Sequence, residues 1–235
     1  MTITTKGLTR AAGLSAAAAG LIFIAVQINH PAMDAASVAT TEWVIRNSAK
    51  VLMGALALVG ITGMYLRQVR QVGVVGLIGY VLFAAGYLLM FATEVVSAYV
   101  LPTLVHLVPG FVNDILVSAA GGTPVGDIGA MKTVFAVTGA GYMVGGLIFG
   151  IAMFRARVLN RWAAALLAVG TIATASLAFL PESFNRPMAV PVGLALIGLG
   201  ISLWRNPSSS PAENADVADA EIADAEITHV ELAAV

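Results

Sequence analysis

Long runs of apolar residues alternate with short polar breaks along most of the 235-residue chain. About 20 consecutive apolar residues cross the hydrocarbon core of a bilayer as one helix. Six runs reach or approach that length, and the breaks between them contain Pro, Gly, Asn or Arg. The pattern predicts six transmembrane helices, at residues 9–29, 49–67, 72–100, 131–154, 161–180 and 188–204.

The composition agrees with a membrane location. Hydrophobic residues make up 59% of the chain and charged residues 11%, and the mean hydropathy is +0.90. A soluble domain carries about 25% charged residues. Because lipid offers the backbone no hydrogen-bond partners, the spans must be helices. We therefore expect an all-α integral membrane bundle in the plasma membrane, with its first span as an uncleaved anchor.

The basic residues predict an orientation. Cytoplasmic ends of membrane helices carry an excess of Lys and Arg. With both termini inside, eight basic residues fall on the cytoplasmic side and four on the outer side. The eight are Lys6, Arg10, Arg67, Arg70, Arg155, Arg157, Arg161 and Arg205, and the four are Arg46, Lys50, Lys132 and Arg186. We expect an N-in, C-in topology.

The C-terminal segment differs from the rest of the chain. Residues 1–205 form the predicted transmembrane domain, whereas 206–235 contain seven acidic residues and no Lys or Arg. Such a segment is typical of a disordered cytoplasmic tail. The alternative is a short helix that binds a basic protein partner or the cytoplasmic arginines of this chain.

The predicted outer loop at 101–130 is long enough to contain a helix of its own. Its apolar residues follow a helical spacing, with Phe111, Ile115 and Ala119 at i, i+4 and i+8 and with Val112 and Leu116 beside them. Pro109–Gly110 can begin this helix, and Gly121–Gly122 can end it. We expect a short amphipathic helix in the outer interface.

Glu94 is the only Asp, Glu, Lys or Arg between Arg70 and Asp114. At 1.5 Å per helical residue it lies about 36 Å beyond Arg70, which exceeds a hydrocarbon core of about 30 Å. Glu94 is therefore expected at the outer boundary of the membrane. A structural ion pair is one interpretation, and binding of a ligand or a proton is the other.

The distances of the outer lysines from the cytoplasmic arginines predict which of them pairs with Glu94. Lys132 lies about 37 Å before Arg157, whereas Lys50 lies only about 26 Å before Arg67. Lys132 matches Glu94 better, so the sequence predicts an ion pair between Glu94 and Lys132.

Glycines follow one another at close spacing in "GAGYMVGG", residues 139–146. A nucleotide-binding G-x-G-x-x-G is excluded because Val144 stands at the third glycine position and no strand precedes the motif. Small residues four apart instead allow close helix packing. Gly141, Gly145, Gly146 and Gly150 are the predicted packing positions, and Gly73, Gly76, Gly79 and Gly86 form a similar stripe.

Candidate chemistry is sparse. His30 and His106 fall in predicted outer segments near several acids, but they lack the i, i+4 spacing of a helical metal motif. The chain has no cysteine, and it has no G-x-S-x-G sequence for a serine nucleophile. We predict no metal, no cofactor and no catalytic residue, and keep His30 and His106 only as ligand candidates.

Residues 50–102 and 132–181 share an order of Lys, span, Arg-containing turn, span and Leu-Pro. Parallel repeats of this kind occur in membrane carriers. The positive-inside bias alone also produces much of the pattern.

The runs "GLTRAAGLSAAAAGLIFIAVQINHP" and "WAAALLAVGT" give residues 1–205 a style rich in Ala, Gly and Val. In this the chain resembles small uncharacterised multi-span membrane proteins of high-GC Gram-positive bacteria. The resemblance rests on hydropathy and style and implies no activity.

Three classes of function remain open. The first is a non-enzymatic membrane component, such as a helper, a sensor or a complex subunit. The second is a small carrier or channel built from two helical hairpins. The third is a membrane enzyme that acts on a lipophilic substrate at the outer face. The expected partners are the lipid bilayer, a protein that binds the acidic tail and a lipophilic small molecule; nucleic acid is not expected.

Overall fold

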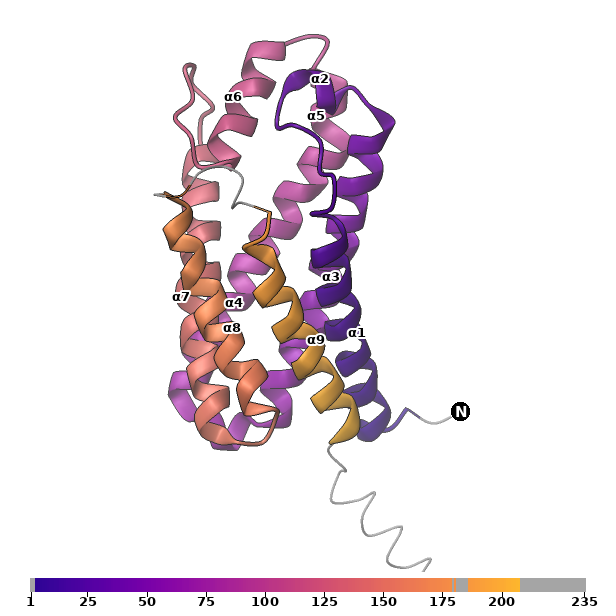
Figure 1. Ribbon diagram of the computed structural model, residues 1–235, viewed down its shortest axis with the longest axis vertical. Helices are drawn as coiled ribbons and strands as arrows, with labels where there is room; N and C mark the ends of the chain where they lie inside the picture. Colours follow the sequence, from indigo (N-terminus) through magenta and orange to yellow (C-terminus); the bar gives the residue numbers. More distant parts are fainter. Residues whose placement is uncertain (1–2, 179, 181–185, 208–235) are drawn as a thin grey trace, which may run out of the picture.

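A computed structural model describes residues 3–178, 180 and 186–207, and its regular elements are all helical (Figure 1). They are α1 (Thr5–Ala25), α2 (Ala35–Val38), α3 (Thr41–Arg67), α4 (Val69–Val95), η1 (Val96–Val100, a π-helix), α5 (Leu101–Leu104), α6 (Pro109–Ala119), α7 (Met131–Ala156), α8 (Arg161–Ala173), η2 (Thr174–Ala178, a 3-10 helix) and α9 (Ala189–Arg205). Nearly all of the predicted acidic tail lies outside the described residues.

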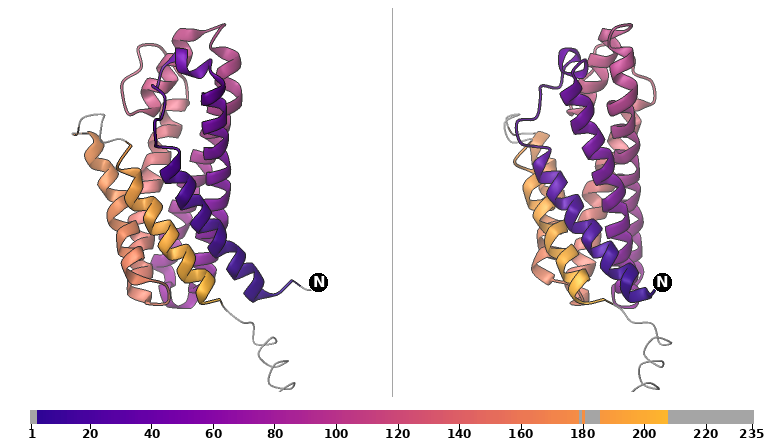
Figure 2. Two further views of the ribbon diagram at one scale, coloured as in Figure 1. Left: turned by 45° about the vertical axis from the view of Figure 1, so that its right-hand side comes forward. Right: turned by 90° about the vertical axis from the view of Figure 1, so that its right-hand side faces the viewer.

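The long helices run side by side in an elongated bundle (Figures 1 and 2). The start of α1, the α3–α4 turn, the α7–α8 turn and the end of α9 lie at one end of it. The eight residues predicted to be cytoplasmic belong to these segments, so we call this the basic end. The short helices α2, α5 and α6 lie at the other end, the α6 end.

The outer surface of the bundle is apolar. Large hydrophobic side chains are exposed along its length, including Leu21, Val74, Leu88, Val144 and Val169. Among the described residues, four helical stretches are long and apolar enough to cross a membrane, namely α1, α3, the continuous stretch Val69–Leu104 and α7. An apolar surface of this extent is suited to lipid rather than to water. These features indicate a membrane protein.

Glycines set the distances between helices, as predicted for α7. A Cβ atom added to Gly145 would overlap the main chain of α4 at Phe83, and one added to Gly141 would lie 3.0 Å from the carbonyl oxygen of Leu82. On the adjacent face, a Cβ at Gly150 would lie 2.7 Å from the backbone nitrogen of Ala168 in α8. A Cβ at Gly146 would come within 2.5 Å of the Thr171 side chain. All four predicted packing positions thus lie where α7 closely approaches α4 or α8.

The first and last helices are equally close. A Cβ at Gly200 of α9 would lie 2.6 Å from the backbone nitrogen of Ala17 in α1. A Cβ at Gly13 of α1 would lie 2.7 Å from the carbonyl oxygen of Gly200. The backbones of α1 and α9 are therefore in direct contact, and α1 also packs on α3.

Gly73 has a different role from Gly79 and Gly86 of the same predicted stripe, and a Cβ at Gly76 would meet only the Val72 side chain. A Cβ at Gly79 or Gly86 would collide with the backbone of α7, so these two are packing positions. A Cβ at Gly73 would have nothing within 4 Å, and Gly73 adopts φ +57° and ψ −155°, which favours glycine over other residues. It bends the chain after one turn, so the long part of α4 begins at Val74.

The boundaries of the helices follow the hydropathy pattern with two physical differences. Helix α3 begins at Thr41 rather than at residue 49, because the side chain of Thr40 caps the helix and a polar turn with Glu42 and Arg46 precedes the apolar run. The fifth predicted span, 161–180, is α-helical only to Ala173 and continues as η2. Hydroxyl groups of Thr174 and Ser176 donate to carbonyls three residues back where this 3-10 turn forms.

The predicted helix in the 101–130 segment is present as α6, with Pro109 in its first turn and Gly121 just beyond its end. Three of the five apolar residues that the spacing singled out form its buried face. Val112, Ile115 and Leu116 are buried, whereas Phe111 and Ala119 are exposed. The buried residues pack with Val38, Trp43, Leu101, Val105 and Ile128, so the neighbours in α2, α3 and α5 decide which stripe of α6 is covered.

Candidate ligand-binding cavity

A cavity of about 390 Å³ lies among α1, α3, α4, α6, α7 and α9, toward the α6 end. Its volume is within the range of about 300–1,000 Å³ that is typical of small-molecule sites. Most of its wall is apolar, and five of the chain's nine methionines line it. They are Met33, Met53, Met90, Met131 and Met188. Methionine side chains are flexible and adapt to ligands of varied shape.

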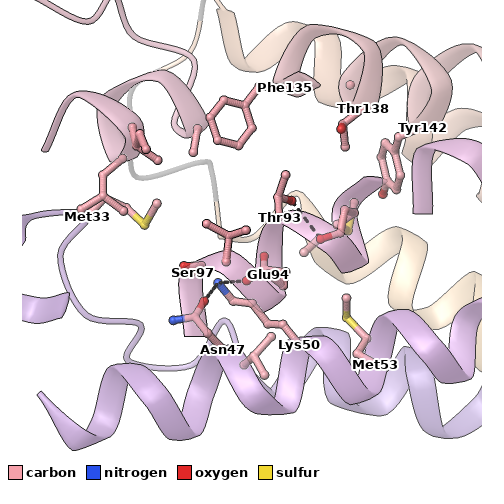
Figure 3. Close-up of a pocket in the computed structure, with 18 of the residues that line it drawn as sticks. Met33, Asn47, Lys50, Met53, Thr93, Glu94, Ser97, Phe135, Thr138 and Tyr142 are labelled. Atoms are coloured by element: carbon pink, nitrogen blue, oxygen red, sulfur yellow. Dashed lines mark hydrogen bonds and ion pairs between the residues drawn. The ribbon is translucent and has the colours of Figure 1, made fainter. Parts of the chain in front are cut away.

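One wall carries an ion pair between α3 and α4 (Figure 3). The Nζ atom of Lys50 lies 3.7 Å from Oε2 of Glu94, and the two side chains are 12% and 20% exposed. Lys50 also donates to Oδ1 of Asn47 at 3.0 Å. The predicted partner of Glu94 was therefore wrong. Lys132 is exposed in the first turn of α7, and no ion pair of Lys132 occurs within the described part of the chain.

The bend at Gly73 explains why the predicted depth of Glu94 was too large. The non-helical conformation of Gly73 interrupts the regular helical rise, so we count the distance along α4 from Val74. Glu94 then lies about 30 Å from the start of its helix, against about 26 Å for Lys50 from Arg67. The long lysine side chain closes the remaining difference.

A chain of hydrogen bonds holds the pair in place. The side-chain amide of Asn47 donates to the carbonyl of Trp43 at 2.8 Å, and the Trp43 indole N–H donates to the carbonyl of Ser97 at 2.9 Å. The Ser97 carbonyl is free to accept because the backbone N–H of Leu101 bonds to Val96, five residues back, as in a π-helix. Such π-helical turns recur at functional sites.

A second cation lines the cavity from the segment before α9. Arg186 is partly buried, and its Nη1 atom lies 3.4 Å from Oε1 of Gln27. This distance is long for a hydrogen bond. Among the described lining residues, the charged side chains are Lys50, Arg186 and Glu94, which give two positive charges and one negative charge.

The opposite wall supplies polar groups from α7. Thr138 and Tyr142 face the ion pair across the cavity (Figure 3). The hydroxyl of Thr138 donates to the carbonyl of Val134 at 2.7 Å, and that of Thr93 on α4 donates to Met90 at 2.9 Å. Because both hydroxyl groups donate their hydrogens within their own helices, the hydroxyl oxygens of Thr138 and Thr93 are available to accept hydrogen bonds from a ligand.

His30 lies close to the cavity without lining it. Its ring meets Trp43 edge to face with centroids 6.2 Å apart, and Nδ1 lies 2.8 Å from the carbonyl oxygen of Pro31. Because that oxygen can only accept, Nδ1 carries the proton. Burial, reinforced by the positive charges of Lys50, Arg186 and Arg46, lowers the pKa of His30 to about 4. The ring is therefore neutral at physiological pH.

The predicted ligand candidates do not form one site. Glu94 lines the cavity and His30 stands beside it, whereas His106 is exposed between α5 and α6 and Lys132 is exposed on α7. No group of three or more His, Asp or Glu side chains that could hold a metal ion occurs among the described residues. Asn47, Trp43 and Arg186 of the cavity were not predicted as site residues. Arg186 was predicted only as a charge on the outer side, and the i, i+3 spacing of Asn47 and Lys50 is the one signal in the sequence that could have indicated this site.

Comparison with known proteins yields no match: no family model fits the chain, and neither a curated protein nor a solved structure is similar to it.

Proposed function

We propose that the chain crosses the plasma membrane six times, with both termini in the cytoplasm. The gathering of eight basic residues at one end of the bundle supports this orientation. Helix α8 together with η2 matches the thickness of the hydrocarbon core, and α9 falls a few ångströms short of it. Helix α8 rises about 20 Å and η2 about 10 Å, and α9 rises about 26 Å, against a core of about 30 Å.

We propose further that the protein is a non-enzymatic membrane component, of the sensor or complex-subunit type, that binds a small amphipathic molecule. The cavity carries this proposal, because it combines a largely apolar wall with an ion pair, a second cation and several hydroxyl groups. A few polar groups in an apolar pocket are the usual composition of a small-molecule site.

Co-purification tests the proposal. Gly139 lines the cavity, and a Cβ added to it would have only the Met143 methyl group at 4.0 Å. Gly139→Leu should therefore fill the cavity without displacing a helix. Ala140→Leu, which adds a similar side chain at the exposed neighbouring position, is the matched control.

The protein would be purified in mild detergent and its bound molecules identified by mass spectrometry. We expect one class of small amphipathic molecule in the wild type and in Ala140→Leu, and its loss in Gly139→Leu. Equal amounts in all three preparations, or none in the wild type, would contradict the proposal.

A carrier is the second candidate, because the cavity wall includes residues from both the α3–α4 and the α7–α8 hairpins. Helices α3 and α4 have 27 residues each, whereas α7 has 26 and α8 has 13, so the two hairpins differ in length. Transport of the co-purified molecule into proteoliposomes would favour the carrier. Binding without transport would favour the sensor.

A further inference from the structure

We infer that the ligand of this cavity is an amphipathic monoanion, with its acidic head group between Lys50 and Arg186 and its apolar chain along the methionine-lined wall. The inference rests on the proposed function and adds the chemical class of the ligand.

The charge of the cavity wall selects the sign of the ligand. The described lining residues include Lys50, Arg186 and Glu94, which leaves one positive charge in excess. An uncompensated charge in apolar surroundings is costly. A head group with one negative charge would neutralise the wall, whereas an ammonium group would add to the excess and a neutral ligand would leave it unchanged.

Within the described part of the chain, both cations retain unused hydrogen-bond donors. An ammonium group has three N–H donors, and Lys50 uses one of them on Asn47 at 3.0 Å. Its distance of 3.7 Å to Glu94 exceeds the approximately 2.7–2.9 Å of a charge-assisted hydrogen bond. Among the described residues, the hydrogen bond of Arg186 is the long one to Gln27, at 3.4 Å. A guanidinium group binds carboxylates and phosphates through two parallel hydrogen bonds, so Arg186 is suited to an oxyanion.

The rest of the wall suits an alkyl or isoprenoid chain. Met53 and Met90 lie on the same two helices as the ion pair, and Phe135 faces them from α7. Ile115 and Leu116 close the cavity at the α6 end. This wall has no charge other than the three named above among the described residues, so only the head group of an amphiphile would be recognised by charge.

Ligands that share one chain and differ in head group test the inference. Equilibrium binding of labelled hexadecanoate, hexadecyl methyl phosphate, hexadecanol and hexadecylamine would be measured on the full-length protein in detergent. We expect at least one of the two monoanions to bind about 10-fold or more tighter than the alcohol, and the amine to bind no better than the alcohol. The tighter of the two anions identifies the head-group chemistry as carboxylate or phosphodiester.

Variants assign the head-group contact. Arg186→Gln should weaken binding of the preferred anion about 10-fold and leave hexadecanol binding unchanged, and Arg186→Lys should restore part of the loss. Lys132→Gln, which removes an exposed cation outside the cavity, should change neither affinity. Folding of each variant would be checked by its melting temperature.

Two results would overturn the inference. Equal affinity for the acid, the phosphate and the alcohol, or preferential binding of the amine, would exclude an anionic ligand while leaving the proposed function intact. Tight anion binding that Arg186→Gln does not alter would place the head group elsewhere. Failure of all four probes to bind, together with no co-purified molecule, would instead contradict the proposed function itself.

Discussion

At the scale of residues, Lys50 and Glu94 place opposite charges 3.7 Å apart while their side chains are only 12% and 20% exposed. Removing charges from water is costly, and their mutual attraction offsets that cost only in part. Loss of one partner should therefore be more harmful than loss of both, because a single charge would remain in a semi-apolar environment.

A double-mutant cycle tests this coupling. We expect Glu94→Gln and Lys50→Met each to lower the free energy of unfolding by about 1–3 kcal/mol, and the double variant to recover part of the summed loss. The cycle would be measured by denaturation in detergent micelles. Lys132→Met combined with Glu94→Gln is the control and should be additive. Coupling of Glu94 to Lys132 instead of Lys50 would refute the pairing seen in the structure.

His30 predicts how stability depends on pH. Burial lowers the pKa of His30 in the folded protein to about 4, from an ordinary value of 6.5. Between these values the unfolded chain binds a proton that the folded protein does not. The contribution of His30 to the free energy of unfolding is therefore fully present above pH 6.5 and is lost as the pH falls toward 4.

Because His30 is only half buried, the loss should be about 1–2 kcal/mol. Melting temperatures of the wild type and of His30→Gln would be compared from pH 7.5 to pH 4.5 (about the interval between the two pKa values). The variant should lose the part of the pH dependence that belongs to His30. His106→Gln, at an exposed position, should keep the wild-type profile. Identical profiles for the wild type and His30→Gln would show that the ring titrates at its ordinary pKa.

At the scale of helices, two glycines of α7 should respond oppositely to alanine. A Cβ at Gly145 would overlap the backbone of α4, which cannot move without separating the helices. A Cβ at Gly139 would meet nothing closer than a methionine methyl group at 4.0 Å. We expect Gly145→Ala to destabilise the protein by about 1–3 kcal/mol, as overpacking does. Gly139→Ala should be neutral or stabilising by up to about 1 kcal/mol, since alanine favours helix.

Thermal unfolding in detergent would measure both variants, and Gly145→Leu should be more severe than Gly145→Ala. An unchanged stability of Gly145→Leu would show that this face of α7 points toward lipid rather than toward α4.

Some helix contacts could be predicted from the sequence and others could not, for physical reasons. The spacing of glycines in α7 predicted the helix contacts because close approach depends only on which face lacks side chains. In α4 the glycine spacing gave a wrong prediction for Gly73, since nothing in the sequence distinguishes the bend at Gly73 from the packing positions Gly79 and Gly86. On α6, the sequence did not predict that Phe111 and Ala119 would be exposed, because the neighbouring helices decide which of its apolar residues are covered.

At the scale of the whole molecule, the orientation in the membrane can be tested with single cysteines, because the chain contains none. A cysteine at Ser209, in the predicted cytoplasmic tail, should resist membrane-impermeant thiol reagents in intact cells and react after the cells are opened. A cysteine at Val125, which is 99% exposed at the α6 end, should react in intact cells. The reverse pattern would invert the proposed topology.

The helical bundle itself was predictable from the sequence, whereas the cavity was not. Each apolar run predicts one helix, and the basic residues predict which helix ends lie on the same side of the membrane. The cavity depends on Arg186 reaching Gln27, which lies 159 residues earlier in the sequence. Both residues line the cavity with Lys50, and the bond from Trp43 to Ser97 joins α3 to η1 in its wall. Such a meeting is set by tertiary packing and leaves no local pattern.

The contact between α1 and α9 has a consequence for biosynthesis. The ribosome releases α1 first and α9 last, yet the glycine faces of these two helices pack backbone against backbone. Gly13 and Gly20 therefore have no partner on α9 until translation is nearly complete. Met188 and Ala189, which line the cavity, are also made late. The nascent protein should acquire its binding site only with its final helix, so chains that end before α9 lack the site and expose the small-residue face of α1.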